Sequence, residues 1–373
     1  MATIGLDGLT VRLGDREVLQ DVDLDVMDGE LLVVAGPSGS GKTTLLRTIA
    51  GFEKPVSGRV LIDGEDVAGL PPGRRDLAMV FQEYALYSNL DAGKNIEFPL
   101  VSRGVKPQSE RDRRVRREAR SFDIEQLLDR MPGELSMGHR QAVSTARSMV
   151  RDSKALLMDE PLSNLDARSR DRARVEVRRM HDDVGSTIVY VTNDQTEAMS
   201  IGTRVAVLDE GRLQQVARPM ELYRAPVNTM VAGFIGTPSM RFVAGELATG
   251  ESGIDLLVGT DRLALGDRPD LVDVVGRPVT VGIRPGDLAP SRGETPFERC
   301  LHGRVTHVVD QGSDAFATVD LGRGESSLLA RLRPGDPHRP GATIELTLDP
   351  DVICFFDPVT GEARGGGRTG PSS

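Results

Sequence analysis

The stretch Leu31-Leu-Val-Val-Ala-Gly-Pro-Ser-Gly-Ser-Gly-Lys-Thr-Thr44 decides how the rest of this sequence is interpreted. Its first five residues are apolar and predict a short buried strand, and the residues from Thr44 onward predict a helix. Between them, residues 36–43 match the pattern G-x-x-x-x-G-K-[ST], in which glycines let backbone N–H groups surround an anion at a helix N-terminus. A glycine-rich turn without a ligand would need neither the lysine nor the full spacing. The stretch therefore predicts a nucleotide-phosphate site.

Two side chains of this motif have direct chemical roles in such a site. Lys42 is expected to reach the β- and γ-phosphates, and the Thr43 hydroxyl is expected to bind Mg²⁺. The complete set of predicted phosphate-binding residues is Gly36, Pro37, Ser38, Gly39, Ser40, Gly41, Lys42, Thr43 and Thr44.

Length and charge narrow the class of protein. The chain has 373 residues, enough for two or three domains of ordinary size. Its net charge of −10 at pH 7 argues against general nucleic-acid binding. Residues 103–120 carry eight basic side chains without interleaved aromatic residues, so we interpret this segment as a solvated helix face rather than a nucleic-acid patch.

Cysteine usage and hydropathy suggest the compartment. Cys300 and Cys354 lie far apart and match no metal or redox spacing, which favours a reducing, cytosolic setting. The first residues lack the charged region and apolar core of a signal peptide. No apolar run approaches the roughly 18 residues that a membrane span needs. We expect a soluble chain that docks on a component that is not itself soluble.

The pattern of strands and helices predicts the domains. Buried strands at 77–81, 155–158 and 187–192 alternate with helices and end in polar residues, which indicates an open α/β sheet with its site at the carboxyl ends of the strands. After residue 236, short β-type runs with Gly, Pro and Asp turns predict a small all-β barrel. The predicted organisation is an α/β domain at 1–235 with a helical subdomain at about 88–150, a β-barrel domain at 236–361, and a disordered tail at 362–373.

Later motifs narrow the class of phosphate-loop protein. Leu156-Leu-Met-Asp-Glu160 places an aspartate able to hold Mg²⁺ at a strand end, followed by a carboxylate able to polarise a water. Leu135-Ser-Met-Gly-His-Arg-Gln141 precedes this pair, and Ser163-Asn-Leu-Asp166 follows it. The order resembles the ATPase subunit of ATP-binding cassette (ABC) transporters. Phe81-Gln-Glu-Tyr-Ala-Leu-Tyr87 resembles the Q-loop of that family, and Tyr190-Val-Thr-Asn-Asp194 resembles its switch region.

The resemblance extends to one branch of the family. Glu221-Leu-Tyr-Arg-Ala-Pro226 and Val281-Gly-Ile-Arg-Pro285 are similar to motifs of carbohydrate importers of the maltose, glycerol-phosphate and trehalose type. This resemblance implies a P-loop α/β ATPase domain with a helical subdomain, followed by a small all-β, OB-like regulatory domain. It implies an ATPase that uses ATP and Mg²⁺ to energise uptake of a sugar or a related solute, such as a glycerophosphodiester.

The same resemblance implies partners and a location. The partners are two transmembrane permease subunits, an extracytoplasmic solute-binding protein and a second copy of the chain in a homodimer, with no nucleic acid. The chain would lie peripherally on the cytoplasmic face of the inner membrane. Residues 84–90 and the helical segment would receive a coupling helix of the permease.

The family motifs assign roles to individual residues. Glu160 is the expected general base, Gln82 and Asn193 are the other expected catalytic residues, and Mg²⁺ would be held by Thr43, Gln82 and Asp159. In the head-to-tail dimer, residues of one copy contact the γ-phosphate bound by the other. The further expected cofactor-binding residues are Leu13, Val18, Ser136, Gly138 and Asp166.

Four positions depart from the family pattern. Leu13 stands where an aromatic ring usually stacks on adenine, and Met137 and His139 replace a glycine and a glutamine of the signature. Asn193 replaces the switch histidine, and an asparagine can donate a hydrogen bond but cannot carry a proton. We expect a working importer ATPase because Lys42 and Glu160 are both retained. The alternative is a weakly hydrolysing regulatory subunit that needs a partner ATPase.

A different class of ABC protein acts on DNA or ribosomes. Such chains usually carry two cassettes or a long coiled-coil insertion. This sequence has one phosphate loop and one signature-like stretch, which favours transport.

Overall fold

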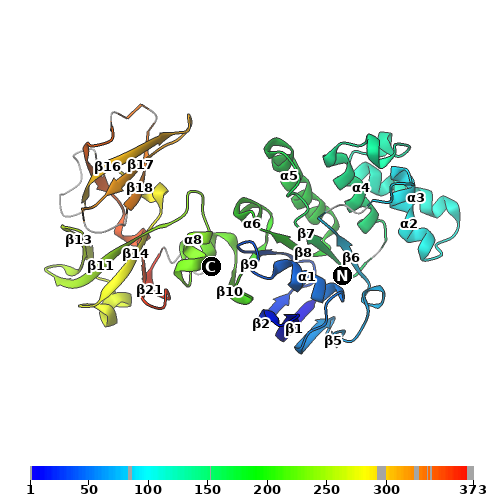
Figure 1. Cartoon of the computed structure of the whole chain (residues 1–373), viewed down its shortest axis with the longest axis horizontal. Coiled ribbons are helices and arrows are strands. Elements are labelled where there is room, and N and C mark those ends of the chain that lie inside the picture. Colours follow the sequence, from blue (N-terminus) through cyan, green and yellow to red (C-terminus); the bar gives the residue numbers. More distant parts are fainter. Residues whose placement is uncertain are drawn as a thin grey trace. The chain divides into compact units, whose positions relative to one another are not determined.

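The computed structural model describes residues 2–82, 86–151, 153–291, 300–322, 327–333, 335–336 and 338–367. The chain forms two compact units, Met1–Pro219 and Met220–Ser373 (Figure 1). Each unit has a hydrophobic core of its own.

The first unit is built on two β-sheets. An antiparallel sheet has the order β2-β1-β4-β5, and a six-stranded sheet has the order β10-β9-β3-β8-β7-β6. In the larger sheet, β9, β3, β8, β7 and β6 are mutually parallel, and β10 adds an antiparallel edge. The strands are β1 (Ile4–Leu13), β2 (Arg16–Val26), β3 (Leu31–Ala35), β4 (Ser57–Ile62), β5 (Glu65–Asp66), β6 (Leu77–Val80), β7 (Ala155–Asp159), β8 (Thr187–Thr192), β9 (Arg204–Asp209) and β10 (Arg212–Ala217).

Helices of the first unit connect these strands. The helices are α1 (Lys42–Ala50), α2 (Ala92–Ser102), α3 (Gln108–Ser121), α4 (Met137–Met149), α5 (Ala167–Val184) and α6 (Gln195–Ile201). Helix α1 follows β3 directly, and its side chains Leu45, Leu46 and Ile49 are fully buried in a core shared with β1, β2 and β3. This burial holds the first turn of α1 at the carboxyl end of β3.

Helices α2, α3 and α4 form the helical subdomain expected at about 88–150, and Figure 1 shows them grouped beside the β6 edge of the sheet. They have a separate apolar cluster that includes Ile96, Leu100 and Val143. The basic side chains of α3 are largely paired with acids, as Arg113 is with Glu110 at 2.7 Å. Such pairing agrees with a solvated helix face.

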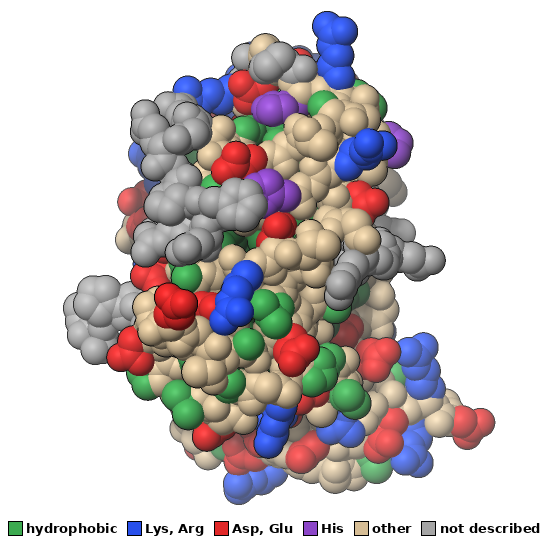
Figure 2. Space-filling model, turned by 90° about the vertical axis from the view of Figure 1, so that its left-hand side faces the viewer, with side chains coloured by type: hydrophobic (Ala, Val, Ile, Leu, Met, Phe, Trp, Pro, Cys, Tyr) green, Lys and Arg blue, Asp and Glu red, His purple; other side chains and the backbone are tan. Residues whose placement is uncertain are grey.

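The second unit contains two antiparallel sheets and two short helices. The sheet orders are β13-β12-β11-β14-β20-β21 and β15-β19-β16-β17-β18. On the face of the molecule that Figure 2 shows, acidic and basic side chains are interspersed. The elements are α7 (Pro219–Arg224), α8 (Thr229–Phe234), β11 (Arg241–Gly250), β12 (Gly253–Val258), β13 (Asp261–Gly266), β14 (Pro278–Ile283), β15 (Ala289–Pro290), β16 (Cys300–Asp310), β17 (Ala315–Asp320), β18 (Ser327–Leu332), β19 (Thr343–Thr347), β20 (Cys354–Phe356) and β21 (Ala363–Gly366).

The structure confirms the fold class and changes two boundaries. The units divide after Pro219 rather than after residue 235, because residues 220–235 are bonded to the second unit. The Arg284 guanidinium, for example, donates to the carbonyls of Tyr223 and Ile235. The predicted tail is also partly ordered, because Ala363–Gly366 forms β21 and pairs with β20. Residues 368–373 lie outside the described part of the chain.

Candidate functional site

The phosphate loop joins β3 to α1, and its backbone requires glycine. Gly39 and Gly41 have φ angles of +81° and +107°, which L side chains rarely adopt. A Cβ on Gly41 would also lie 2.9 Å from the Val18 carbonyl oxygen and from Leu19 Cδ2. Strand β2 is therefore packed closely against the loop, and Gly41 provides the N-cap position of α1.

The Lys42 ammonium is held by the loop itself. Its Nζ donates to the carbonyl oxygens of Gly36 at 3.0 Å and Pro37 at 2.7 Å. Burial lowers the pKa of Lys42, and the carboxylates of Glu160 and Asp159 oppose that shift. Lys42 is 4% exposed, so its ammonium group is buried among carbonyl oxygens. A positive charge at this place would stabilise a bound phosphate.

Thr43 and Asp159 meet although they are far apart in sequence. The Thr43 hydroxyl donates to Asp159 Oδ1 at 2.9 Å. Burial raises the pKa of Asp159, and the bond from Thr43 opposes the rise. Because burial has the larger effect, this carboxylate disfavours its own charge and would gain from a bound cation. The two residues present hydroxyl and carboxylate oxygens, the ligand type that Mg²⁺ prefers.

Glu160 follows the end of β7 in an unusual backbone conformation. Its φ is +43°, and its N–H donates to the Val191 carbonyl of β8 at 2.9 Å. Backbone outliers of this kind persist when the surroundings over-determine them, and they cluster at functional sites. Burial raises the pKa of Glu160, Lys42 opposes the rise and Asp159 adds to it. A carboxylate in this position can accept a proton from a water beside the phosphate loop.

Asn193 contacts the Glu160 carboxylate, and Gln82 is linked through Ser163 to the backbone of the same residue. Asn193 Nδ2 donates to Glu160 Oε2 at 3.4 Å. Gln82 Nε2 donates to Ser163 Oγ at 3.5 Å, and Ser163 Oγ in turn donates to the Glu160 carbonyl at 2.8 Å. The structure thus brings Lys42, Thr43, Gln82, Asp159, Glu160 and Asn193 together around the carboxyl ends of β3, β7 and β8.

The signature-like residues are gathered elsewhere. Ser136 is the N-cap of α4 and accepts from His139 N–H at 3.3 Å. Ser136, Gly138 and Asp166 line a pocket of about 410 Å³, to which the described part of the phosphate loop does not contribute. Asp166 caps α5 by accepting from the Ser169 N–H at 3.0 Å. Met137 is 54% exposed, so its bulk lies on the surface.

Two further residues expected to bind the cofactor, Leu13 and Val18, are on the β1–β2 hairpin. Leu13 ends β1 opposite Arg16 and is 43% exposed. Val18 lies on β2, where its carbonyl oxygen is against Gly41. Contact of either residue with a nucleotide stays a prediction.

Sequence reasoning missed one member of this region. Arg170 NH2 donates to the Leu165 carbonyl at 3.0 Å, and its NH1 donates to Asp194 Oδ2 at 3.4 Å. The sequence feature that could have identified Arg170 is its position on a helix, one turn after Asp166.

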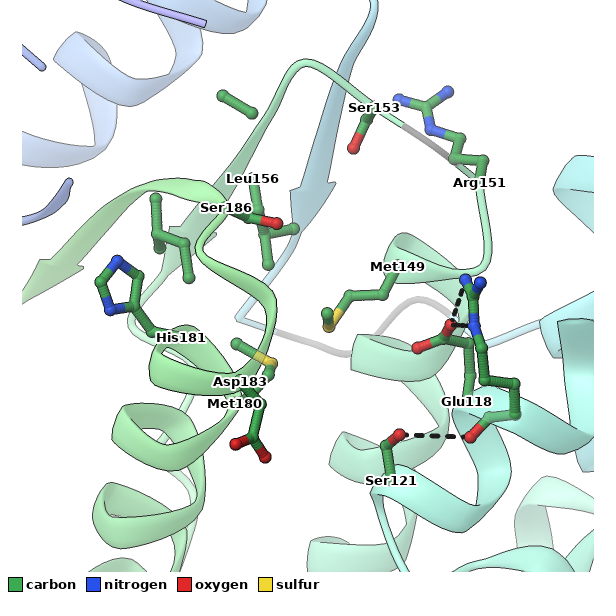
Figure 3. A pocket seen from close by; sticks show the side chains of 13 residues that line it. Glu118, Ser121, Met149, Arg151, Ser153, Leu156, Met180, His181, Asp183 and Ser186 are labelled. Carbon is green, nitrogen blue, oxygen red and sulfur yellow. Dashed lines mark hydrogen bonds and ion pairs between the residues drawn. The ribbon is translucent and has the colours of Figure 1, made fainter. Parts of the chain in front are cut away.

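Another pocket of about 560 Å³ lies between α3 and α4 on one side and α5 on the other (Figure 3). Met149 and Met180 line it together with charged residues. Its Arg117 Nε donates to the neighbouring Glu118 at 2.8 Å, so that cation is already paired. The described phosphate loop contributes no lining residue to this pocket. The candidate phosphate-binding site is therefore the β3–α1 loop and not this pocket.

Comparison with known proteins identifies the family of this chain. Residues 19–163 match the family described as ABC transporter, and residues 281–356 match the TOBE domain. The sulfoquinovosyl glycerol transport ATP-binding protein of Agrobacterium fabrum is 39% identical over 370 residues, covering 96% of this chain and 99% of that protein. The chain belongs to the ABC transporter ATP-binding proteins.

Other comparisons extend this assignment of an ABC ATP-binding subunit. The trehalose/maltose import ATP-binding protein of Thermococcus litoralis is 41% identical over 378 residues, covering 97% of this chain and 100% of that protein. A solved dimeric structure of an ATP-binding cassette, bound to ADP and phosphate after hydrolysis, matches with a TM-score of 0.53 and 30% identity. That match covers 58% of this chain and 98% of the cassette.

Two further observations concern membranes and metals. Within the described residues, helices of this ABC ATP-binding subunit are all too short or too polar to cross a membrane. The described residues also contain no group of three or more His, Cys, Asp or Glu side chains arranged to hold a metal ion. A site with one carboxylate fits Mg²⁺, which usually takes one or two protein carboxylates together with phosphate oxygens.

Proposed function

We propose that this chain hydrolyses MgATP to drive uptake of a sugar or a related solute through a membrane permease. The relatives named for sulfoquinovosyl glycerol transport and trehalose/maltose import align with nearly the whole chain. The arrangement of Glu160 beside the phosphate loop carries the proposal, because a binding protein without catalysis would not need that carboxylate.

In this proposal each residue has a defined task. The loop N–H groups and Lys42 bind the phosphates, which neutralises charge that develops during phosphoryl transfer. Glu160 orients the attacking water and accepts its proton. Asn193 donates to Glu160 and orients its carboxylate.

Thr43, Asp159 and Gln82 would hold Mg²⁺. Bound there, the ion would supply charge neutralisation on the phosphate oxygens. The hydroxyl, the buried carboxylate and the side-chain amide of these residues are all oxygen donors for a hard cation.

We also propose that two copies of the chain share the nucleotide. Ser136 and Gly138 lie apart from the phosphate loop of their own chain, in the pocket that also contains Asp166. A second copy, placed head to tail, would bring these residues to the γ-phosphate. The similarity to a dimeric cassette supports this arrangement.

The permease would dock on an apolar surface of the first unit. Phe52 and Phe81 are 47% and 37% exposed, and their ring centroids are 6.0 Å apart. They line a pocket of about 280 Å³ with Pro99. Exposed aromatic groups of this kind mark protein interfaces. Residues 84 and 85 of the expected docking segment 84–90 lie outside the described residues.

The remaining partners and the location follow from the same proposal. An extracytoplasmic solute-binding protein would deliver the solute to two permease subunits. The chain would lie on the cytoplasmic face of the inner membrane, and the absence of a nucleic-acid partner stays a prediction.

Steady-state ATP hydrolysis by the full chain tests the proposal. We expect turnover that Glu160→Gln abolishes and that magnesium chelation removes. The regulatory alternative would be favoured if the chain bound MgATP tightly but hydrolysed it no faster than the Glu160→Gln variant. This comparison is made with the chain alone and with its permease subunits. The exposed Met137 and the 3.4 Å contact of Asn193 are the features that favour that alternative.

A further inference from the structure

Arg170 joins two segments that the sequence separates. Its NH2 donates to the Leu165 carbonyl at 3.0 Å, immediately before Asp166. Its NH1 donates to Asp194 Oδ2 at 3.4 Å, immediately after Asn193. One guanidinium therefore connects the segment expected at the dimer interface with the segment that carries the catalytic amide.

Asp194 is held firmly on the other side of this contact. Its Oδ1 accepts from the backbone N–H groups of Thr196 at 2.7 Å and Glu197 at 3.2 Å, and so caps α6. Its own N–H donates to Thr192 Oγ1 at 3.0 Å. With Oδ1 occupied by the helix and Oδ2 by Arg170, the backbone at Asn193 has little freedom to shift independently.

Glu197 provides a second anchor. Its Oε2 accepts from Tyr190 OH at 2.9 Å and from Thr192 Oγ1 at 2.8 Å. Its Oε1 lies 4.0 Å from Arg170 Nε, which is buried and has no hydrogen-bond partner within the described part of the chain. The guanidinium is thus drawn toward α6 by two carboxylates, while only one carbonyl holds it on the Leu165 side.

We propose that Arg170 is a positioning residue that couples residues 165–166 to Asn193 and, through it, to Glu160. A guanidinium is planar and rigid, so a displacement of one acceptor is passed to the other. When a second copy contacts Asp166, the Leu165 carbonyl and Asp194 move together, and the 3.4 Å contact of Asn193 with Glu160 tightens. This inference rests on the proposed ATPase function and adds a residue to it.

The competing explanation is that Arg170 only fastens α5 to α6. Arg170→Lys separates the two explanations, because lysine keeps the positive charge near Asp194 and Glu197 but cannot bridge both acceptors. Arg179→Lys is the matched control. Arg179 is on the same helix, in an exposed ion pair with Asp183 at 3.8 Å.

Turnover by the full chain provides the first measurement. We expect Arg170→Lys to lower kcat about tenfold, the effect of losing one hydrogen bond to a charged group, with KM for MgATP within about twofold of wild type. The double variant Arg170→Lys/Asn193→Ala should be no slower than Asn193→Ala alone. An unchanged kcat, or losses that multiply in the double variant, would overturn the inference.

A second measurement does not depend on turnover. With asparagine-selective labelling, the side-chain NH₂ resonance of Asn193 should shift in Arg170→Lys and stay in place in Arg179→Lys. An unmoved resonance in both variants contradicts the coupling, whatever the activity. Absence of Glu160-dependent turnover in the wild-type chain would instead overturn the proposed function, and the resonance would still decide the role of Arg170.

Discussion

Asn193 Nδ2 donates to Glu160 Oε2 across a distance of 3.4 Å, so the amide at the switch position touches the expected base directly. This is a long hydrogen bond, and the asparagine amide cannot change its protonation state as a histidine can. The base is therefore oriented weakly by a neutral group.

The first prediction concerns this contact. Asn193→His should raise kcat by about tenfold or more, because a preorganised donor that reaches the transferred phosphate is commonly worth about 10²–10³ in rate. Steady-state ATP hydrolysis by the full chain with its permease checks it. Asn193→Ala is the control and should be slower than wild type. A rate for Asn193→His at or below that of wild type would show that the site has adapted to asparagine.

The second prediction is a pH dependence. Burial raises the pKa of Glu160, with Asp159 adding to the rise and Lys42 opposing it. The ionised carboxylate is the active form of a general base, so activity is present above the raised pKa and is lost as pH falls through it. The acid limb of kcat/KM, which reports the free enzyme, should therefore lie above the ordinary glutamate value of about 4.3. A pH–rate profile measures it, and a limb at or below that value would contradict the assignment.

The third prediction concerns stability at the site. Burial raises the pKa of Asp159 above its unfolded value. The folded state then binds this proton more tightly, so the contribution of Asp159 to stability is fully present below the unfolded pKa and is lost as pH rises through the folded pKa. Asp159→Asn should consequently raise Tm at pH 7 while abolishing turnover. Glu160→Gln should likewise raise Tm at pH 7 and abolish turnover. A lower Tm for both amides would show that these carboxylates stabilise the fold.

The fourth prediction tests the hydroxyl on the expected cation. Thr43→Val keeps the shape of the side chain but removes the donor to Asp159. Titration calorimetry should show MgATP binding weakened by about tenfold, since one ligand and one hydrogen bond are lost. Binding of ATP in the presence of a chelator should change little. Thr43→Ser is the control and should bind as wild type does. Equal weakening with and without Mg²⁺ would indicate damage to the phosphate loop instead.

The fifth prediction concerns the second unit. Arg284 is 3% exposed, donates to the Tyr223 and Ile235 carbonyls, and stacks at 3.8 Å over the Tyr223 ring. Arg284→Met leaves those carbonyls unpaired, at a cost of about 3 kcal/mol in local opening free energy. Hydrogen exchange of β14 amides should report the loss. The exposed Arg277→Met is the control, and equal exchange in both variants would contradict the role of Arg284.

The sequence by itself determined the phosphate loop and the order of the motifs. The structure of residues 31–44 is predictable from these residues alone, because an apolar strand, glycines with positive φ and a following helix are local properties. The α/β character of the first unit and the all-β character of the second were predictable for the same reason. The identity of Asp159 and Glu160 as strand-end carboxylates also followed from the adjacent apolar run.

Only the tertiary structure decided which of these groups meet. Thr43 lies 116 positions from its partner Asp159, and the contact exists because β8 pairs with both β3 and β7 in one parallel sheet. The bridge made by Arg170, the pairing of β21 with β20 and the division after Pro219 are likewise contacts between distant segments. A local pattern specifies an element, whereas strand order and packing specify its neighbours.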